Sequence, residues 1–153
     1  MEDQTKYIDL GLPSGTLWAE GNASFDGVDL LTFGEASVRF GRLLPSWNDY
    51  AELITRCRHR YDTARGGSVF TGPNGNELFF PCGSMKCYVP ESENQRPGYV
   101  HLDGYSRYWS CSAPRDRKNQ LMCLIVQDTL SACGFPYHEL NRYNVRLCRR
   151  RTP

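Results

Sequence analysis

The stretch VFTGPNGNELFFP, residues 69–81, joins two apolar runs through a series of turn residues. Its flanks, SVF and ELFF, are rich in the aromatic and β-branched residues that favour strands. Between them, Pro73, Asn74, Gly75 and Asn76 form a turn sequence, because Asn and Gly tolerate a positive φ angle. A phosphate-binding loop would need a helix directly after it and a lysine, and neither is present here. The stretch therefore predicts a β-hairpin, a corner of the fold rather than a ligand-binding loop.

The segment before this hairpin, PSWNDYAELITRC at residues 45–57, has the clearest helical pattern in the chain. Ser46 is a favourable N-cap, and Asp49 places a negative charge in the first turn, where the helix dipole favours it. Behind this cap, apolar residues recur at helical spacing: they are Trp47, Tyr50, Leu53, Ile54 and Cys57. We interpret this stripe as a contact with the core and predict one main helix.

Short extended segments account for the other regular structure that we predict. Residues 7–10 and 16–19 predict two early strands with a glycine turn between them. RYWSCSA, NQLMCLIVQ and YNVRLCRR predict three late strands. Three further segments lack a sustained period and are interpreted as loops: they are residues 22–45, 82–106 and 128–142.

Length and composition indicate one globular domain over residues 1–153, with 40% hydrophobic and 23% charged residues. The net charge of +1 hides an asymmetry, since residues 1–55 carry −6 and residues 56–153 carry +7. If the acidic and basic halves of the sequence stay apart in the folded protein, the charge separation favours head-to-tail packing or an anionic partner. We prefer the alternative that the charges mix in the fold. No apolar run approaches the roughly 20 residues of a membrane span, and the N-terminus shows no export signal.

Seven cysteines without a Cys-x-x-Cys pair argue against zinc-ribbon or thioredoxin-like chemistry. We expect buried free thiols, with Cys123 and Cys148 as the clearest examples. In an oxidising compartment, Cys82 and Cys87 are close enough in sequence to form a bridge.

Catalytic and metal-binding patterns are weak. The three histidines, His59, His101 and His138, are scattered and offer no base beside a nucleophilic cysteine. The motif Trp47-Asn48-Asp49 is similar to one at the calcium site of sugar-binding lectins, but no acidic cluster accompanies it. No paired carboxylates or cofactor fingerprint are present. We therefore expect a non-enzymatic protein without a metal or cofactor.

Two late segments, residues 113–120 and 134–143, combine basic and aromatic residues. Tyr, Arg and Asn are common where proteins recognise other surfaces. The alternative is that these are solvated loops with tyrosines at the edge of the core. The candidate binding residues are Arg115, Arg117, Lys118, Tyr137, His138, Asn141 and Tyr143.

The order of the segments resembles the gut-bacterial major paralogous domain family (FISUMP), whose domain has a C-type-lectin-like fold. Six blocks carry the resemblance and follow one another in the family's order. They are YIDLGLPSGTLWA at residues 7–19; FGE at 33–35; LPS at 44–46 with Tyr50, Glu52 and Leu53; FTGPNGN at 70–76 with FFP at 79–81; YWS at 108–110; and NVRL at 144–147.

The resemblance implies an α+β, C-type-lectin-like fold with small antiparallel sheets, one main helix and long loops. It also implies that the first and last strands lie side by side, that the helix packs on their sheet, and that the long loops emerge together on one face. Binding usually takes place on such loops.

From these observations we expect a non-catalytic recognition or structural module that contacts protein or glycan without metal. The missing export signal and a domain beginning near Met1 favour a phage virion component, such as a capsid decoration or tail protein. One alternative is a bacterial surface adhesin whose signal has been removed. Another is a cysteine-dependent enzyme of the lectin-like fold. No nucleic-acid partner is expected, and a homo-oligomer remains open.

Overall fold

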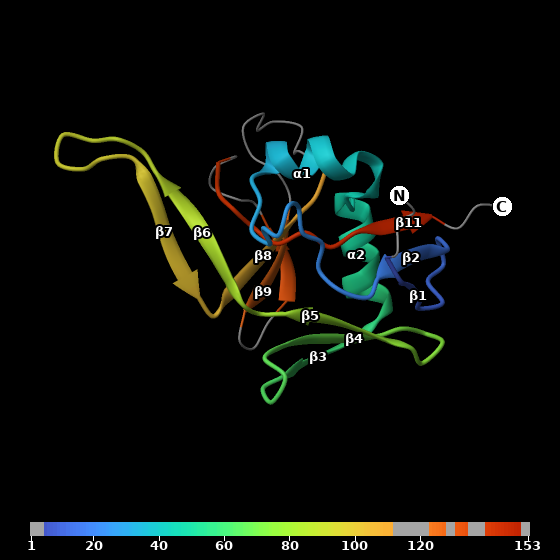
Figure 1. The fold of residues 1–153 in the computed structure, drawn as a ribbon. Helices are drawn as coiled ribbons and strands as arrows, with labels where there is room; N and C mark the ends of the chain where they lie inside the picture. The colour runs from blue at the N-terminus through green and yellow to red at the C-terminus, as the bar shows by residue number, and fades with distance from the viewer. Residues whose placement is uncertain (1–4, 112–122, 128–130, 135–139, 151–153) are drawn as a thin grey trace.

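The computed structural model describes residues 5–111, 123–127, 131–134 and 140–150. They form an α+β protein of small antiparallel sheets and two α-helices, of which α2 lies among the sheets and α1 lies at the edge of the body (Figure 1). The elements in chain order are β1 (Tyr7–Asp9), β2 (Thr16–Ala19), α1 (Phe33–Phe40), the 3₁₀ turn η1 (Gly41–Leu43), α2 (Trp47–Arg56), β3 (Arg58–Asp62), β4 (Gly67–Thr71), β5 (Glu77–Pro81), β6 (Ser84–Val89), β7 (Gly98–Asp103), β8 (Tyr105–Trp109), β9 (Cys123–Gln127), β10 (Ser131–Gly134) and β11 (Cys148–Arg150). No helix in this part of the chain is both long and apolar enough to cross a membrane.

The predicted hairpin is confirmed. Strands β4 and β5 pair antiparallel, with Val69 opposite Phe79 and Thr71 opposite Glu77, and β3 pairs with the other edge of β4. Gly75 has a φ angle of +90°, as the turn sequence requires.

The turn of this hairpin also packs against the end of β1. The side-chain amides of Asn74 and Asn76 donate to the Asp9 carbonyl oxygen at 2.7 and 2.8 Å. Gly72 lies so close to β1 that an added Cβ would be 2.1 Å from the carbonyl oxygen of Leu10. The turn therefore joins the β3–β4–β5 sheet to the sheet that contains both ends of the chain.

The predicted helix is confirmed as α2, and a capping box fixes its start. The Ser46 hydroxyl accepts from the Asp49 amide at 3.2 Å, and the Asp49 carboxylate accepts from the Ser46 amide at 2.8 Å. The buried Tyr50 ring lies 5.5 Å from the Trp18 ring of β2, and its hydroxyl donates to the Trp109 carbonyl oxygen of β8 at 2.9 Å. Helix α2 therefore packs between the β1–β2–β11 sheet and the β8–β9–β10 sheet (Figure 1).

The first and last strands lie in one sheet, but they are not adjacent. Strand β2 is central, and Trp18 stands opposite Ile8 of β1 on one side and Cys148 of β11 on the other. The predicted direct pairing of the two ends is therefore wrong. Their membership of one sheet, with a helix packed on it, agrees with the expectation.

Three segments that were expected to be loops contain regular structure. Residues 33–40 form α1, which begins at a Thr32 N-cap with a complete capping box to Glu35. Residues 84–103 form the β6–β7 hairpin, and residues 131–134 pair with β9 as β10. The prediction of a single main helix is corrected to two. Gly34 and the neighbouring glycines disfavour a helix in the sequence pattern, but the Thr32 N-cap stabilises the start of α1.

A fully buried arginine, Arg146, lies in the core. Its guanidinium donates to the Asn22 side-chain oxygen at 2.7 and 3.1 Å and to the Phe79 carbonyl oxygen at 2.7 Å. It lies 4.2 Å from the centre of the Phe80 ring, a cation–π distance. These contacts tie the segment before β11 to β5 and to the chain after β2.

Candidate functional site

The binding residues predicted from the sequence fall into two groups. Five of them lie outside the described residues: Arg115, Arg117, Lys118, Tyr137 and His138. The other two, Asn141 and Tyr143, are buried.

Asn141 and Tyr143 make contacts inside the protein. The Asn141 side-chain oxygen accepts from the Tyr88 amide at 2.7 Å, and its amide donates to the Tyr143 hydroxyl at 2.8 Å. The Tyr143 ring lies 4.4 Å from the Trp109 ring, and burial raises the pKa of its hydroxyl to about 12. These two side chains anchor β6 to the core, so they are not available to a surface ligand.

Cys82 and Cys87 are both free thiols, so the suggested Cys82–Cys87 bridge is not present. Cys123 and Cys148 are buried, as predicted. Burial raises the pKa of Cys57 to about 11, and it also raises the pKa of Cys87 and Cys148. Because the thiolate is the reactive form, these three thiols are poor nucleophiles.

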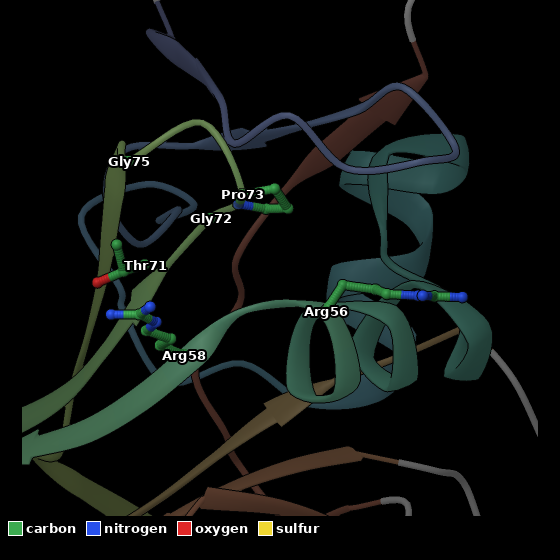
Figure 2. A pocket seen from close by; sticks show the side chains of 6 residues that line it. All are labelled: Arg56, Arg58, Thr71, Gly72, Pro73 and Gly75. Atoms are coloured by element: carbon green, nitrogen blue, oxygen red, sulfur yellow. The ribbon is translucent and has the colours of Figure 1, made fainter.

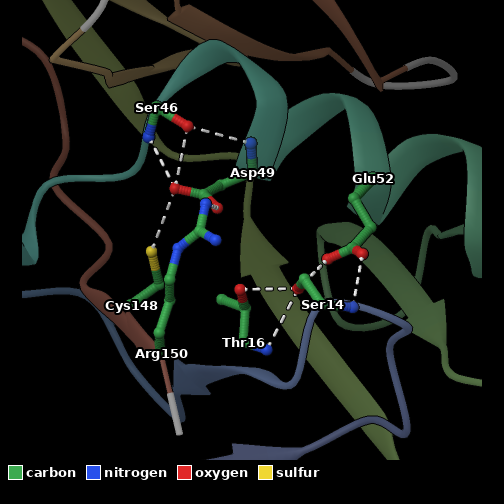
Figure 3. A network of polar contacts seen from close by, with 7 residues as sticks. All are labelled: Ser14, Thr16, Ser46, Asp49, Glu52, Cys148 and Arg150. Atoms are coloured by element: carbon green, nitrogen blue, oxygen red, sulfur yellow. Dashed lines mark hydrogen bonds and ion pairs between the residues drawn. The ribbon is translucent and has the colours of Figure 1, made fainter. Parts of the chain in front are cut away.

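Polar side chains at the start of α2 form a structural network (Figure 3). The Asp49 carboxylate accepts from Ser46 and lies 3.7 Å from the Cys148 sulfur of β11 and 3.9 Å from the Arg150 guanidinium. One turn further on, Glu52 accepts from the Ser14 hydroxyl at 2.6 Å and from the Ser14 amide at 3.0 Å. Both carboxylates hold the helix against the β1–β2–β11 sheet. Across the described ranges, no group of three or more His, Cys, Asp or Glu side chains could hold a metal ion.

A hollow of about 390 Å³ lies where the end of α2 meets the turn of the β4–β5 hairpin. We call it the arginine pocket; its lining residues are Arg56, Arg58, Thr71, Gly72, Pro73 and Gly75. Figure 2 shows the Arg58 guanidinium beside Thr71, whereas Arg56 extends from the end of the helix in another direction. Both arginines are exposed. Among the described residues, no carboxylate pairs with either guanidinium within 4.0 Å. The pocket can therefore accept an anionic group.

The β6–β7 hairpin, residues 84–103, extends away from the rest of the chain, and we call it the arm (Figure 1). Strand β6 is attached to the body by a bridge between Lys86 and Arg142. Strand β7 has no second partner strand within the described part of the chain. It exposes two large apolar side chains, Tyr99 at 43% and Val100 at 47%.

The arm and the arginine pocket were both missed by sequence reasoning. The arm fell within a predicted loop, although KCYV and GYVHL are short runs of strand-forming residues on either side of a turn. The pocket depends on the packing of α2 against a distant turn, which no local pattern reports.

Comparison with known proteins gives no match for this chain among protein-family models, curated proteins or solved structures.

Proposed function

We propose that this chain is a non-catalytic recognition or structural module whose contact surface is the arm. The observation that carries the proposal is a projecting two-stranded hairpin with an unpaired outer strand and exposed aromatic and aliphatic side chains. Exposed strand edges are templates for pairing with another chain, and Tyr is enriched at recognition surfaces.

The arm is held in a fixed position on the body by hydrogen bonds, as a docking element requires. Asn141 holds the backbone of Tyr88, and the main chains of Lys86 and Arg142 exchange two hydrogen bonds at 2.7 and 3.0 Å. Tyr88 and Tyr99 pack across the two strands with their ring centres 5.7 Å apart. A hairpin fixed in this way loses little conformational freedom when it binds, which favours affinity.

The raised pKa values of Cys57, Cys87 and Cys148 weigh against the alternative of a cysteine-dependent enzyme at these positions. The partner in the proposal is a protein or glycan bound without metal. The finer assignment, a C-type-lectin-like scaffold in a phage virion component, rests on the FISUMP resemblance. The shared sheet of β1, β2 and β11 supports that scaffold.

Sedimentation of phage particles tests the virion assignment. Particles released from cells that carry the encoding genome are purified on a density gradient, and the chain is measured by quantitative mass spectrometry. A virion component should band with the particles at a fixed number of copies per particle. If the chain stays in the soluble or cell-envelope fraction, the virion assignment is wrong, and envelope recovery supports the adhesin alternative.

A further inference from the structure

Two surfaces of this chain carry opposite charges that remain unpaired, and they lie at opposite ends of the molecule. One is the arginine pocket, at the turn of the β4–β5 hairpin. The other is the tip of the arm. In Figure 1 the arm extends from one side of the body, whereas the β4–β5 turn lies on the other side. The tip therefore cannot reach the pocket of its own chain.

The tip of the arm is acidic and has a defined shape. Ser92 and Gln95 exchange main-chain hydrogen bonds at 3.0 and 3.2 Å, which closes a turn with Glu93 inside it and Glu91 beside it. Both glutamates are exposed, and neither lies within 4.0 Å of a cation in the described part of the chain. Arg96 follows the turn, so the tip has two acidic groups and one basic group.

The arginine pocket has the complementary charge. Arg56 and Arg58 both line it and are exposed, with the Arg58 guanidinium beside Thr71 and the Arg56 side chain extending away from the end of the helix. On the turn side, Gly75 leaves open space, since nothing lies within 4 Å of an added Cβ there. Glu77 contacts the lining, since its carboxylate lies 3.5 Å from the Thr71 hydroxyl. That carboxylate pairs with Arg60 at 3.6 Å and not with Arg56 or Arg58.

We infer that the occupant of the arginine pocket is the acidic tip of the arm from a second copy of this chain, with Glu91 and Glu93 facing the Arg58 guanidinium beside Thr71 and Arg56 adding positive charge at the rim. This deepens the proposed function by naming a partner for the arm, and it rests on that proposal for the arm's role as a contact surface. A pocket at one end and a complementary tip at the other make a heterologous contact. Such contacts repeat from copy to copy and generate a ring or a filament.

The contact is electrostatic and exposed, so it is weak and sensitive to salt. Exposed ion pairs contribute modestly, and loss of two of them should weaken association by about tenfold at low ionic strength. The Debye length falls from roughly 30 Å at 0.01 M salt to about 8 Å at 0.15 M, so added salt should produce a similar loss.

Sedimentation velocity of the purified full chain tests the inference, with neutral substitutions on each surface. The tip variant is E91Q/E93Q, and the pocket variant is R56Q/R58Q. The wild type should form a concentration-dependent series of oligomers in low salt. At a concentration where the wild type associates, each variant alone, with its contact weakened about tenfold, should remain largely monomeric. A mixture of the two variants should form a 1:1 dimer and stop there, because only one intact tip and one intact pocket can meet.

Single-charge variants at other exposed positions provide the control. D29N and R42Q remove one acidic and one basic group that lie more than 4.0 Å from any opposite charge in the described part of the chain, and both should associate like the wild type. All variants should keep the wild-type circular dichroism spectrum, since every altered side chain is exposed.

Three results would overturn the inference. One is a wild type that remains monomeric in low salt at millimolar concentration. The second is association that the tip and pocket variants leave unchanged, and the third is a mixture that grows beyond the dimer. None of these results bears on the proposed docking role itself, which depends on whether the chain bands with particles.

Discussion

Replacing Gly72 by alanine should separate the β4–β5 turn from β1. The added Cβ would lie 2.1 Å from the carbonyl oxygen and 2.6 Å from the Cβ of Leu10, and ordinary contact begins at 3.4 Å. The turn must then move by about 1.3 Å, because the obstructing atoms include backbone. That movement breaks or stretches the hydrogen bonds from Asn74 and Asn76 to Asp9. Overpacking costs about 1–3 kcal/mol, and each lost hydrogen bond adds about 1 kcal/mol or less at this exposed site.

We therefore expect Gly72→Ala to lower the free energy of unfolding by about 2–4 kcal/mol, measured by urea denaturation with tryptophan fluorescence. Two alanine variants separate the causes. Gly75 has a φ angle of +90° and nothing within 4 Å of an added Cβ, so its variant should lose only about 1 kcal/mol through backbone strain. Gly98 has open space and no positive φ, so its variant should stay within about 0.5 kcal/mol of wild type. A Gly72 variant no less stable than the Gly75 variant would refute the close approach to β1.

Three further outcomes are expected. Arg146→Met should lower the free energy of unfolding by about 3 kcal/mol, because the part-buried oxygens of Asn22 and Phe79 lose their donors; a loss below 1 kcal/mol in urea titration would contradict this. Glu35→Gln should destabilise the protein by about 0.5–1 kcal/mol at pH 7, since the backbone hydrogen bond from Thr32 and the charge of Arg142 lower the pKa of the carboxyl. Stability from a lowered carboxyl pKa is fully present above the pKa of the unfolded chain and is lost as the pH falls through the lower pKa of the folded protein. Thermal melts should therefore show the difference between variant and wild type shrink as the pH falls below the ordinary carboxyl pKa of about 4.3; a constant difference would refute it. Among the described thiols, iodoacetamide should modify the exposed Cys111 first and the buried Cys57 and Cys148 only on unfolding, as followed by peptide mass spectrometry; early labelling of either buried thiol would count against their burial.

The sequence predicts those elements whose signals are local. The hairpin around Gly75 and helix α2 with its Ser46 cap were predicted because turn residues and capping residues act on their immediate neighbours. The same logic could have found α1, since Thr32 and Glu35 form a capping box before a short amphipathic segment. Its eight residues and internal Gly34 made the helical period too short to recognise.

Elements that depend on distant partners were not predicted. Strand β2 lies between β1 and β11 because Trp18 packs under α2, and nothing in the three short strand sequences specifies that order. Asn141 and Tyr143 are residue types that are common in recognition loops, yet both are buried. Burial is tolerated because the Asn141 amide donates a hydrogen bond to the Tyr143 hydroxyl. The arginine pocket likewise exists only once α2 and the β4–β5 turn have packed together.

Electron cryomicroscopy of gradient-purified particles gives the most direct measurement of a docking role for the arm. A map should place this chain on the particle with β7 and the loop before it, residues 90–103, in contact with a neighbouring subunit. A map in which the chain is bound but the arm extends freely into solvent would contradict that role.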